Sequence, residues 1–165
     1  MPSKAGDESP YLSGYHLCMM RHGSASPRGT AGVTDDAKRA LTPEGKKKME
    51  DIARGLTRLG VKLDWIVTSP LVRAVETAEI VADSCPIKVP LDITDTLSPS
   101  GSPEGLLEFL AKSPHRKRVL VVGHEPDLSE LAARLIGAGR DAHLSFKKGG
   151  CCLISFDEFP PKSPG

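Results

Sequence analysis

The chain has 165 residues, which suits a single domain that buries a substantial core. Hydrophobic residues make up 39% and charged residues 26%, the composition of an ordinary soluble globular protein. Lys and Arg together number 22 and Asp and Glu 21. This balance gives no overall attraction to nucleic acid or to a membrane surface, so neither partner is expected and any anion site must be local.

The two ends and the cysteines place limits on the organisation. Residues 1–14 are rich in Ser, Pro, Gly and charge and lack the apolar core of a signal peptide, so we expect a flexible tail on a cytoplasmic protein. Residues 15–159 are expected to form one domain and residues 160–165 a second tail. No Cys-x-x-Cys pair occurs, which favours reduced, buried thiols over disulfides or a metal site at the four cysteines, Cys18, Cys85, Cys151 and Cys152.

The first third of the chain reads as strand, loop and helix. An apolar run over residues 15–20 predicts a strand, and a polar, Gly-rich loop follows it to about Leu41. Thr42 and Pro43 then carry the signature of a helix N-cap followed by the first helical position. Apolar residues recur at helical spacing until Gly60, and they are Met49, Ile52, Ala53, Leu56 and Leu59.

The middle of the chain repeats the alternation. Residues 63–67 predict a second strand, and Ser69-Pro70 repeats the cap-then-proline signature. The helix expected there buries a stripe of Leu71, Ala74, Val75, Ala78, Val81 and Ala82. Arg73 lies off this stripe, in the first turn, where it can point toward the strand ends. Residues 87–91 form a further short strand-like piece.

The last third completes an α/β pattern. Ser102-Pro103 opens a third helix, and the continuous apolar run 118–122 is typical of a strand buried on both faces. Residues 126–136 predict a fourth helix. Residues 143–146 and 151–156 read as a hairpin that supplies an antiparallel edge. Together these patterns predict an α/β/α sandwich of three layers on a mostly parallel sheet.

Polar residues stand where three of these strands end. Arg21 and His22 follow the first strand, Arg73 follows the second and His124 follows the strand over 118–122. Ligands of open α/β sheets bind outside the carboxyl ends of the strands, so the four side chains are expected to converge. Two guanidinium groups suit the oxygens of a phosphoryl group. A neutral histidine beside them can act as a nucleophile, and a second can stabilise charge or transfer a proton.

Metal binding is the competing use of two histidines. A metal site needs further His, Cys, Asp or Glu ligands at matched spacing, and only Glu125 accompanies His124. Its side chain is expected to point away from that of its neighbour, and flanking arginines repel a cation. We therefore expect a phosphate site without metal.

Four segments resemble one known family. Along the chain these are Arg21-His22-Gly23, Leu41-Thr42-Pro43-Glu44-Gly45, the pattern Ser-Pro-x-x-Arg-Ala-x-x-Thr-Ala over residues 69–78, and Gly123-His124. In this order they are similar to the motifs of the histidine phosphatase superfamily, also called phosphoglycerate-mutase-like. The short chain and the loop over residues 97–101 look most like the SixA-type branch of phosphohistidine phosphatases.

This resemblance implies a phosphoglycerate-mutase-like fold and a set of roles. His22 would be the nucleophile that becomes phosphorylated, and Arg21, Arg73 and His124 would hold the phosphoryl oxygens. It implies no metal and no organic cofactor. In the loop that follows, Gly23, Ser24 and Arg28 are candidates for further substrate contacts.

The chain departs from the family in lacking an evident general acid. Many members have a Glu directly after Arg-His-Gly and a second carboxylate later, whereas here Ser24 follows Gly23 and residues 97–101 contain no carboxylate. A phosphoester leaves as an alkoxide and needs a proton, whereas phosphohistidine leaves as imidazole. The sequence therefore favours a phosphatase that acts on a phosphohistidine-bearing protein, such as a phosphotransfer domain or a phosphocarrier, and releases inorganic phosphate.

Two alternatives remain open. A small-molecule phosphomonoesterase of the same superfamily would need Asp95 or Glu104 to reach the pocket as the acid. A non-catalytic phosphate-binding module would need no acid, but the retention of His22 and both arginines speaks against it.

Overall fold

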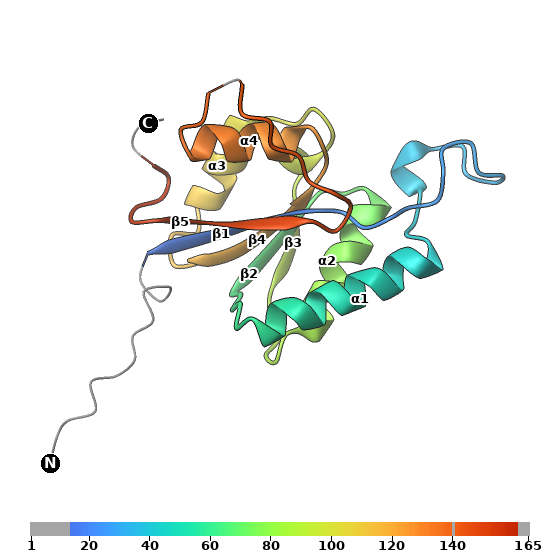
Figure 1. Ribbon diagram of the computed structural model, residues 1–165, viewed down its shortest axis with the longest axis horizontal. Coiled ribbons are helices and arrows are strands. Elements are labelled where there is room, and N and C mark those ends of the chain that lie inside the picture. Colours follow the sequence, from blue (N-terminus) through green and yellow to red (C-terminus); the bar gives the residue numbers. More distant parts are fainter. Residues whose placement is uncertain (1–13, 140, 162–165) are drawn as a thin grey trace, which may run out of the picture.

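The computed structural model describes residues 14–139 and 141–161. Within these residues the strands form one five-stranded sheet in the order β3-β2-β4-β1-β5 (Figure 1). Neighbouring strands run parallel except for the antiparallel pair of β1 and β5. The strands are β1 (Tyr15–Arg21), β2 (Trp65–Thr68), β3 (Leu91–Ile93), β4 (Arg118–Gly123) and β5 (Cys151–Phe156).

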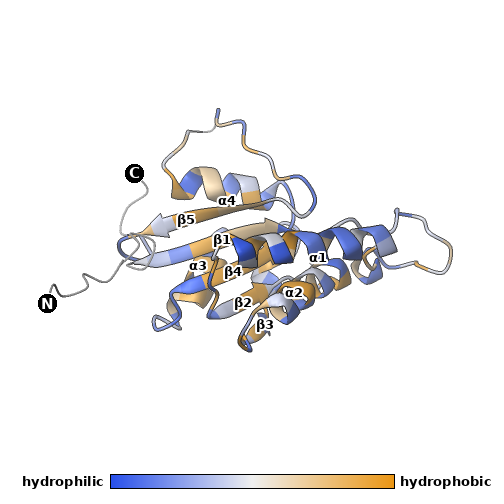
Figure 2. Ribbon diagram, turned by 60° about the horizontal axis from the view of Figure 1, so that its bottom comes forward, coloured by the Kyte–Doolittle hydropathy of each residue, from blue (hydrophilic) through white to orange (hydrophobic). Residues whose placement is uncertain are grey.

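Two helices cover each face of the sheet. The helices are α1 (Pro43–Arg58), α2 (Val72–Ser84), α3 (Pro103–Ala111) and α4 (Asp127–Leu135). Alternate residues of β4 point to opposite sides: Val119 and Val121 join the core under α3 and α4, and Leu120 and Val122 the core under α1 and α2. Figure 2 shows the apolar colour along the strands and the polar residues on the outward side of α1. The three-layer α/β/α fold with an antiparallel edge is therefore confirmed.

The signals for two helix starts are confirmed at the level of single hydrogen bonds. The Thr42 hydroxyl accepts a hydrogen bond from the Gly45 amide at 2.9 Å, and the Ser102 hydroxyl accepts one from Gly105 at 2.9 Å. Each side chain satisfies an N–H group that the first turn of the helix leaves without a partner.

The predicted start of α2 is wrong. The helix begins at Val72, with Leu71 as the flanking residue and no side-chain cap. The Ser69 hydroxyl accepts a hydrogen bond from the Leu71 amide at 3.3 Å and also contacts His124 at 2.8 Å. Ser69 therefore holds the turn ahead of the helix and a residue of the site, instead of capping the helix.

Two predicted strands are displaced along the chain. The second strand covers Trp65–Thr68 instead of residues 63–67, and the third covers Leu91–Ile93 instead of 87–91. Pro86 precedes the residues expected in the third strand and Pro90 lies among them, and neither can donate a backbone hydrogen bond to a neighbouring strand. Ile87 is accordingly 70% exposed.

The predicted hairpin is also wrong, because residues 143–146 form no strand. The amide of Phe146 donates to the Glu125 carboxylate and its carbonyl accepts from Arg21. Side chains therefore take the hydrogen-bonding groups that a partner strand would use. The strand over residues 151–156 forms as expected and pairs with β1.

The remaining predictions on organisation are tested in part. All four cysteines are free, but only Cys18 is buried, and Cys151 is exposed because β5 is the last strand of the sheet. Residues 1–13 and 162–165, most of the two predicted tails, lie outside the described residues. In the part of the chain that is described, no helix has both the length and the apolar character needed to cross a membrane.

Two glycines of α1 test how closely this helix packs against the loop that precedes it. A Cβ at Gly45 would lie 2.2 Å from the Ser24 carbonyl oxygen, whereas one at Gly55 meets nothing within 4 Å. We expect Gly45→Ala to lower the free energy of unfolding by about 1–3 kcal/mol, since the backbone of the 24–42 loop must move. Gly55→Ala should raise it by about 0.5–1 kcal/mol through helix propensity. Urea denaturation of both variants measures this, and equal effects would contradict the close approach.

Candidate active site

The carboxyl ends of three adjacent strands bring the predicted residues together. In the parallel pair of β1 and β4, Arg21 lies opposite Gly123. The His22 amide extends this ladder by donating to the Gly123 carbonyl at 3.1 Å, and the Ser69 amide donates to Val122 at 3.1 Å. The three chain segments therefore leave the sheet at one level, as expected from the sequence.

His22 is held in one tautomer. Its Nδ1 lies 2.7 Å from the Gly23 carbonyl oxygen, which can only accept, so Nδ1 carries the proton. Its Nε2 therefore carries a lone pair, which accepts a hydrogen bond from the Nε of Arg73 at 3.3 Å. Burial, followed by the charges of Arg73, Arg21 and Lys148, lowers the pKa of His22 to about 4, against the opposing effect of the Gly23 hydrogen bond. The ring is neutral at pH 7 and carries a lone pair that can attack phosphorus.

His124 lies beside His22, with the ring centroids 5.1 Å apart and the planes at 55°. Its Nε2 forms a hydrogen bond with the Ser69 hydroxyl at 2.8 Å. Burial, then the neighbouring His22 and Arg73, lower the pKa of His124 to about 3. Both histidines are therefore neutral at pH 7, and the positive charge around them comes from Arg21 and Arg73, with Lys148 nearby.

Arg73 is buried, with 3% of its surface exposed. Its two terminal nitrogens donate to one residue: Nη1 to the Asp36 carbonyl at 2.9 Å and Nη2 to the Asp36 carboxylate at 3.2 Å. The 3₁₀ turn η1 (Asp36–Lys38) thus packs over the guanidinium. In Figure 1 the light-blue segment that carries this turn projects beyond the start of α1.

Arg21 offers an unused donor. Its Nη1 donates to the Phe146 carbonyl at 2.9 Å, which holds the guanidinium against the 144–149 segment. Its Nε is buried and, among the described residues, has no hydrogen-bond partner. An anion oxygen at the strand ends can supply the missing acceptor, since a buried donor without a partner is costly.

The Thr77 side chain connects Gly23 with Arg73. Its hydroxyl accepts a hydrogen bond from the Gly23 amide at 3.0 Å and donates to the Arg73 carbonyl at 2.7 Å. The side chain is fully buried. It links the loop after His22 to the first turn of α2.

Gly23, Ser24 and Arg28, which are predicted to contact the substrate, lie in different surroundings. The amide of Gly23 is taken by Thr77, and a Cβ at this position would lie 2.7 Å from Met49 Cγ. The Ser24 carbonyl accepts from the Thr42 amide at 2.9 Å, which ties this residue to the start of α1. Arg28 has an 83% exposed side chain and pairs with Asp36 at 3.2 Å. The roles of these three residues toward a substrate remain predictions.

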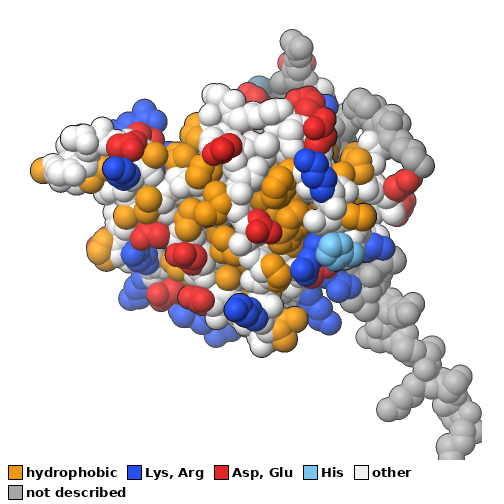
Figure 3. Space-filling model, turned by 180° about the vertical axis from the view of Figure 1, so that it is seen from behind, with side chains coloured by type: hydrophobic (Ala, Val, Ile, Leu, Met, Phe, Trp, Pro, Cys, Tyr) orange, Lys and Arg blue, Asp and Glu red, His pale blue; other side chains and the backbone are white. Residues whose placement is uncertain are grey.

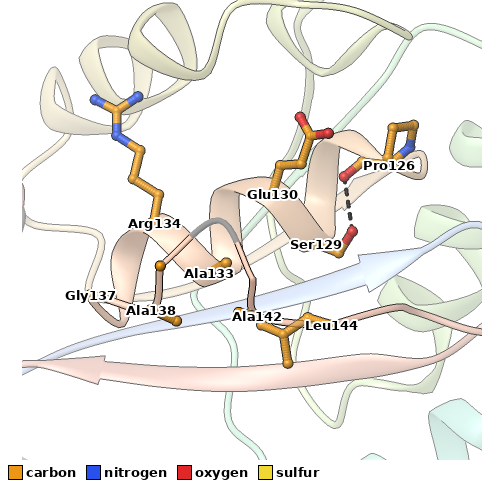
Figure 4. Close-up of a pocket in the computed structure, with 10 residues that line it drawn as sticks. Pro126, Ser129, Glu130, Ala133, Arg134, Gly137, Ala138, Ala142 and Leu144 are labelled. Carbon is orange, nitrogen blue, oxygen red and sulfur yellow. Dashed lines mark hydrogen bonds between the residues drawn. The ribbon is translucent and has the colours of Figure 1, made fainter.

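The two candidate acids of the esterase alternative lie in different surroundings. Glu104 pairs with Arg134, which lies in the last turn of α4, about 10 Å along the helix from its first residue, Asp127. Asp95 is exposed at the start of the 3₁₀ turn η2 (Asp95–Leu97). Figure 4 shows Arg134 and Glu130 beside a hollow of about 840 Å³, which α4 and the following segment line without His22, His124, Arg21 or Arg73.

Charge is mixed on the rest of the surface that can be seen. On the face of Figure 3, acidic and basic side chains alternate around an apolar area and no single-sign field forms. Among the described residues, no group of three or more His, Cys, Asp or Glu side chains is placed to hold a metal ion. The concentration of arginines at the strand ends is thus a local feature.

Several residues that hold the site escaped the sequence analysis. Asp36 contacts Arg73 from the loop before α1, and Phe146 acts through its backbone. Thr77 belongs to the Ser-Pro-x-x-Arg-Ala-x-x-Thr-Ala resemblance, but no role was predicted for it. Lys148 adds positive charge near His22. The sequence predicts Ser69 as a helix cap. Its position beside a strand end is the signal that points to a contact with His124.

The two depressed histidine pKa values predict how stability depends on pH. The unfolded chain protonates each ring near pH 6.5, whereas the native rings resist protonation down to about pH 4 and pH 3. The stability from the neutral rings is complete above pH 6.5 and is lost as the pH falls toward these values. We expect the double variant His22→Gln/His124→Gln to show a shallower fall between pH 6.5 and 4 when unfolding is followed by Trp65 fluorescence. If stability falls as steeply with pH in the double variant as in the wild type, the lowered pKa values of His22 and His124 are contradicted.

The Thr77 bridge gives a second prediction. Thr77→Val keeps the shape but leaves the buried Gly23 amide without an acceptor, so the free energy of unfolding should fall by about 1–3 kcal/mol. Thr77→Ser keeps the hydroxyl and should retain most of the stability and the activity of the site. Urea denaturation of the pair decides this, and the contact is refuted if Ser and Val are equally destabilising.

Comparisons of the sequence with known proteins identify relatives. Residues 17–98 match the model of the histidine phosphatase superfamily, branch 1. An uncharacterized protein of Picosynechococcus sp. is 37% identical over 137 residues, which is 81% of each chain. The mitochondrial serine/threonine-protein phosphatase Pgam5 of Drosophila melanogaster is 38% identical over 66 residues, which is 40% of this chain and 22% of Pgam5.

Comparisons with solved structures agree on the fold. The protein histidine phosphatase SixA complexed with tungstate superposes with a TM-score of 0.74 at 24% identity, over 86% of this chain and 88% of that one. A SixA protein from Agrobacterium tumefaciens, described as a putative phosphohistidine phosphatase, gives 0.74 at 20% identity, over 86% and 92%. An α-ribazole-5'-phosphate phosphatase from Escherichia coli, also described as putative, gives 0.69 at 22%, over 86% and 90%. The fold is phosphoglycerate-mutase-like, and the chain belongs to the histidine phosphatase superfamily.

Proposed function

We propose that the protein is a metal-independent phosphatase that hydrolyses phosphohistidine on a protein substrate through a phosphorylated His22. The observation that carries this proposal is the state of the carboxylates around the strand ends. Asp36, Glu125 and Glu76 all accept hydrogen bonds from N–H groups, so none of these three is set up to donate a proton. Asp95, which follows the end of β3, is exposed. Family membership supports the phosphatase chemistry.

In the first step the phosphoryl group of the substrate binds at the strand ends. The guanidinium groups of Arg21 and Arg73 hold its oxygens, with the unpartnered Nε of Arg21 as one donor. The Nε2 lone pair of His22 forms a bond to phosphorus while the bond from phosphorus to the substrate histidine breaks. The electron pair of that bond returns to the substrate imidazole, and the Gly23 carbonyl stabilises the charge that develops on His22.

In the second step water attacks the phosphorus of phosphorylated His22. The bond from phosphorus to Nε2 breaks and its electron pair returns to the ring. The attacking water becomes the fourth oxygen of inorganic phosphate, keeps one proton and gives the other to a phosphoryl oxygen, so the product leaves as dihydrogen phosphate. His124 lies beside the ring of His22, where it can stabilise the charge of the transferring group or pass a proton.

The leaving group explains why this site favours phosphohistidine. An alkoxide needs a proton as it leaves, whereas an imidazole protonated at its other nitrogen leaves as a neutral molecule. The carboxylate that contacts Arg73 cannot supply a proton at pH 7, because its hydrogen bond from Arg39 and then the charge of Arg73 lower the pKa of Asp36. The fold alone does not select the substrate, since it also carries phosphatases that are named for small phosphoesters.

A phosphorylated protein and a trapping reagent test the proposal together. We expect the protein to release phosphate from a phosphohistidine-bearing phosphotransfer domain or phosphocarrier, and His22→Ala to lower the rate on the order of 10³-fold or more. A labelled phosphoramidate should leave label on His22. The exposed His115→Ala is the matched control and should retain activity and label.

Each opposite result has a distinct meaning. Fast hydrolysis of p-nitrophenyl phosphate with no release from phosphohistidine would refute the substrate and support the phosphomonoesterase alternative. Phosphate binding without label on His22 and without turnover would refute the enzyme and support a binding module.

A further inference from the structure

The carboxylate of Asp36 accepts hydrogen bonds from three arginines. Its carboxylate accepts from Arg39 Nε at 2.8 Å, from Arg28 Nε at 3.2 Å and from Arg73 Nη2 at 3.2 Å. Its backbone carbonyl accepts from Arg73 Nη1 at 2.9 Å. Nothing in the chemistry of phosphoryl transfer requires a carboxylate here, so its presence needs an explanation.

The contacts define the orientation of the Arg73 guanidinium at both ends. Both terminal nitrogens donate to Asp36, while Nε donates toward Nε2 of His22 at 3.3 Å. A planar group held at these points has little freedom to rotate. The guanidinium is therefore held in one orientation beside His22.

The loop holds Asp36 from its other side. Arg39, whose side chain is 13% exposed, also donates from Nη1 to the Ser26 carbonyl at 2.8 Å. The Ser26 amide in turn donates to the Ala40 carbonyl at 2.9 Å. The ion pair with Arg28 is solvent-exposed and contributes little. Arg39 therefore anchors the carboxylate, and the carboxylate anchors Arg73.

This arrangement has an electrostatic cost for binding. The negative charge of Asp36, in contact with Arg73, repels the phosphoryl group that the guanidinium is to hold, so it weakens the affinity for anions. The contact with Asp36 fixes the orientation of Arg73, and this can raise the rate, because misplacement of a catalytic group slows a chemical step. We propose that Asp36 is a positioning residue that orients Arg73 for phosphoryl transfer at the expense of anion affinity. The inference rests on the proposed function.

Removing the charge should separate the two effects. Asp36→Asn keeps the backbone carbonyl and the size of the side chain but loses the charge-assisted contact to Nη2. We expect kcat for phosphohistidine hydrolysis to fall about 10- to 100-fold, with KM unchanged or lowered. Inorganic phosphate should bind to this variant about 2- to 10-fold more tightly, measured by calorimetry.

Two further variants complete the experiment. Asp35→Asn is the matched control, because within the described part of the chain the Asp35 side chain accepts only from the Ala37 amide, at 3.0 Å, and pairs with no arginine. It should leave kcat and the affinity for phosphate near those of the wild type. Asp36→Glu restores the charge and should recover part of kcat, which a role of the backbone carbonyl alone would not produce.

The outcomes are separable from those of the proposed function. Unchanged kcat in Asp36→Asn, or a loss of phosphate binding together with kcat, overturns the positioning role. If the wild type hydrolyses no phosphohistidine, the proposed function fails, and the comparison of phosphate affinities still decides the inference: tighter binding in Asp36→Asn supports the contact, and weaker or equal binding overturns it.

Discussion

The parallel alignment of β2, β4 and β1 is the constraint on which the site depends. Because parallel strands end at the same edge, residues separated by about 50 positions in the sequence meet without a dedicated connection. β4 lies between the other two and is buried on both faces, so its register cannot slip without moving apolar residues to the wrong side. The strand register that packs the core is therefore the same register that brings His22, His124 and Arg73 together.

The site combines two buried neutral rings with cations that remain charged. Burial makes a charged imidazole unfavourable, and the arginines add to that effect, so the lone pair on Nε2 of His22 is available throughout the neutral range. The tautomer depends on one backbone carbonyl, that of Gly23, whose own amide is held by Thr77. The reactivity of the ring is therefore determined by a short chain of hydrogen bonds that starts inside α2.

Local signals in the sequence predicted the four central residues and the α/β/α layers. Polar residues that follow apolar runs mark strand ends, and Thr42 and Ser102 cap helices as their spacing indicated. The supporting contacts could not be predicted, because they join positions far apart. Phe146 meets Arg21 across 125 positions, and Asp36 meets Arg73 across 37. The same long-range contacts explain the missing hairpin strand, since side chains occupy the backbone groups of Phe146.

The arginines around Asp36 connect the architecture of the site with its substrate. A carboxylate beside a phosphoryl site serves as an acid only where its pKa is raised, which requires burial away from cations. Here the pKa of Asp36 is lowered, first by Arg39, so the carboxylate stays ionised. The contacts that let it orient Arg73 therefore prevent it from donating a proton. Under the proposed function, such a site needs a leaving group that already carries its proton, and phosphohistidine meets that condition.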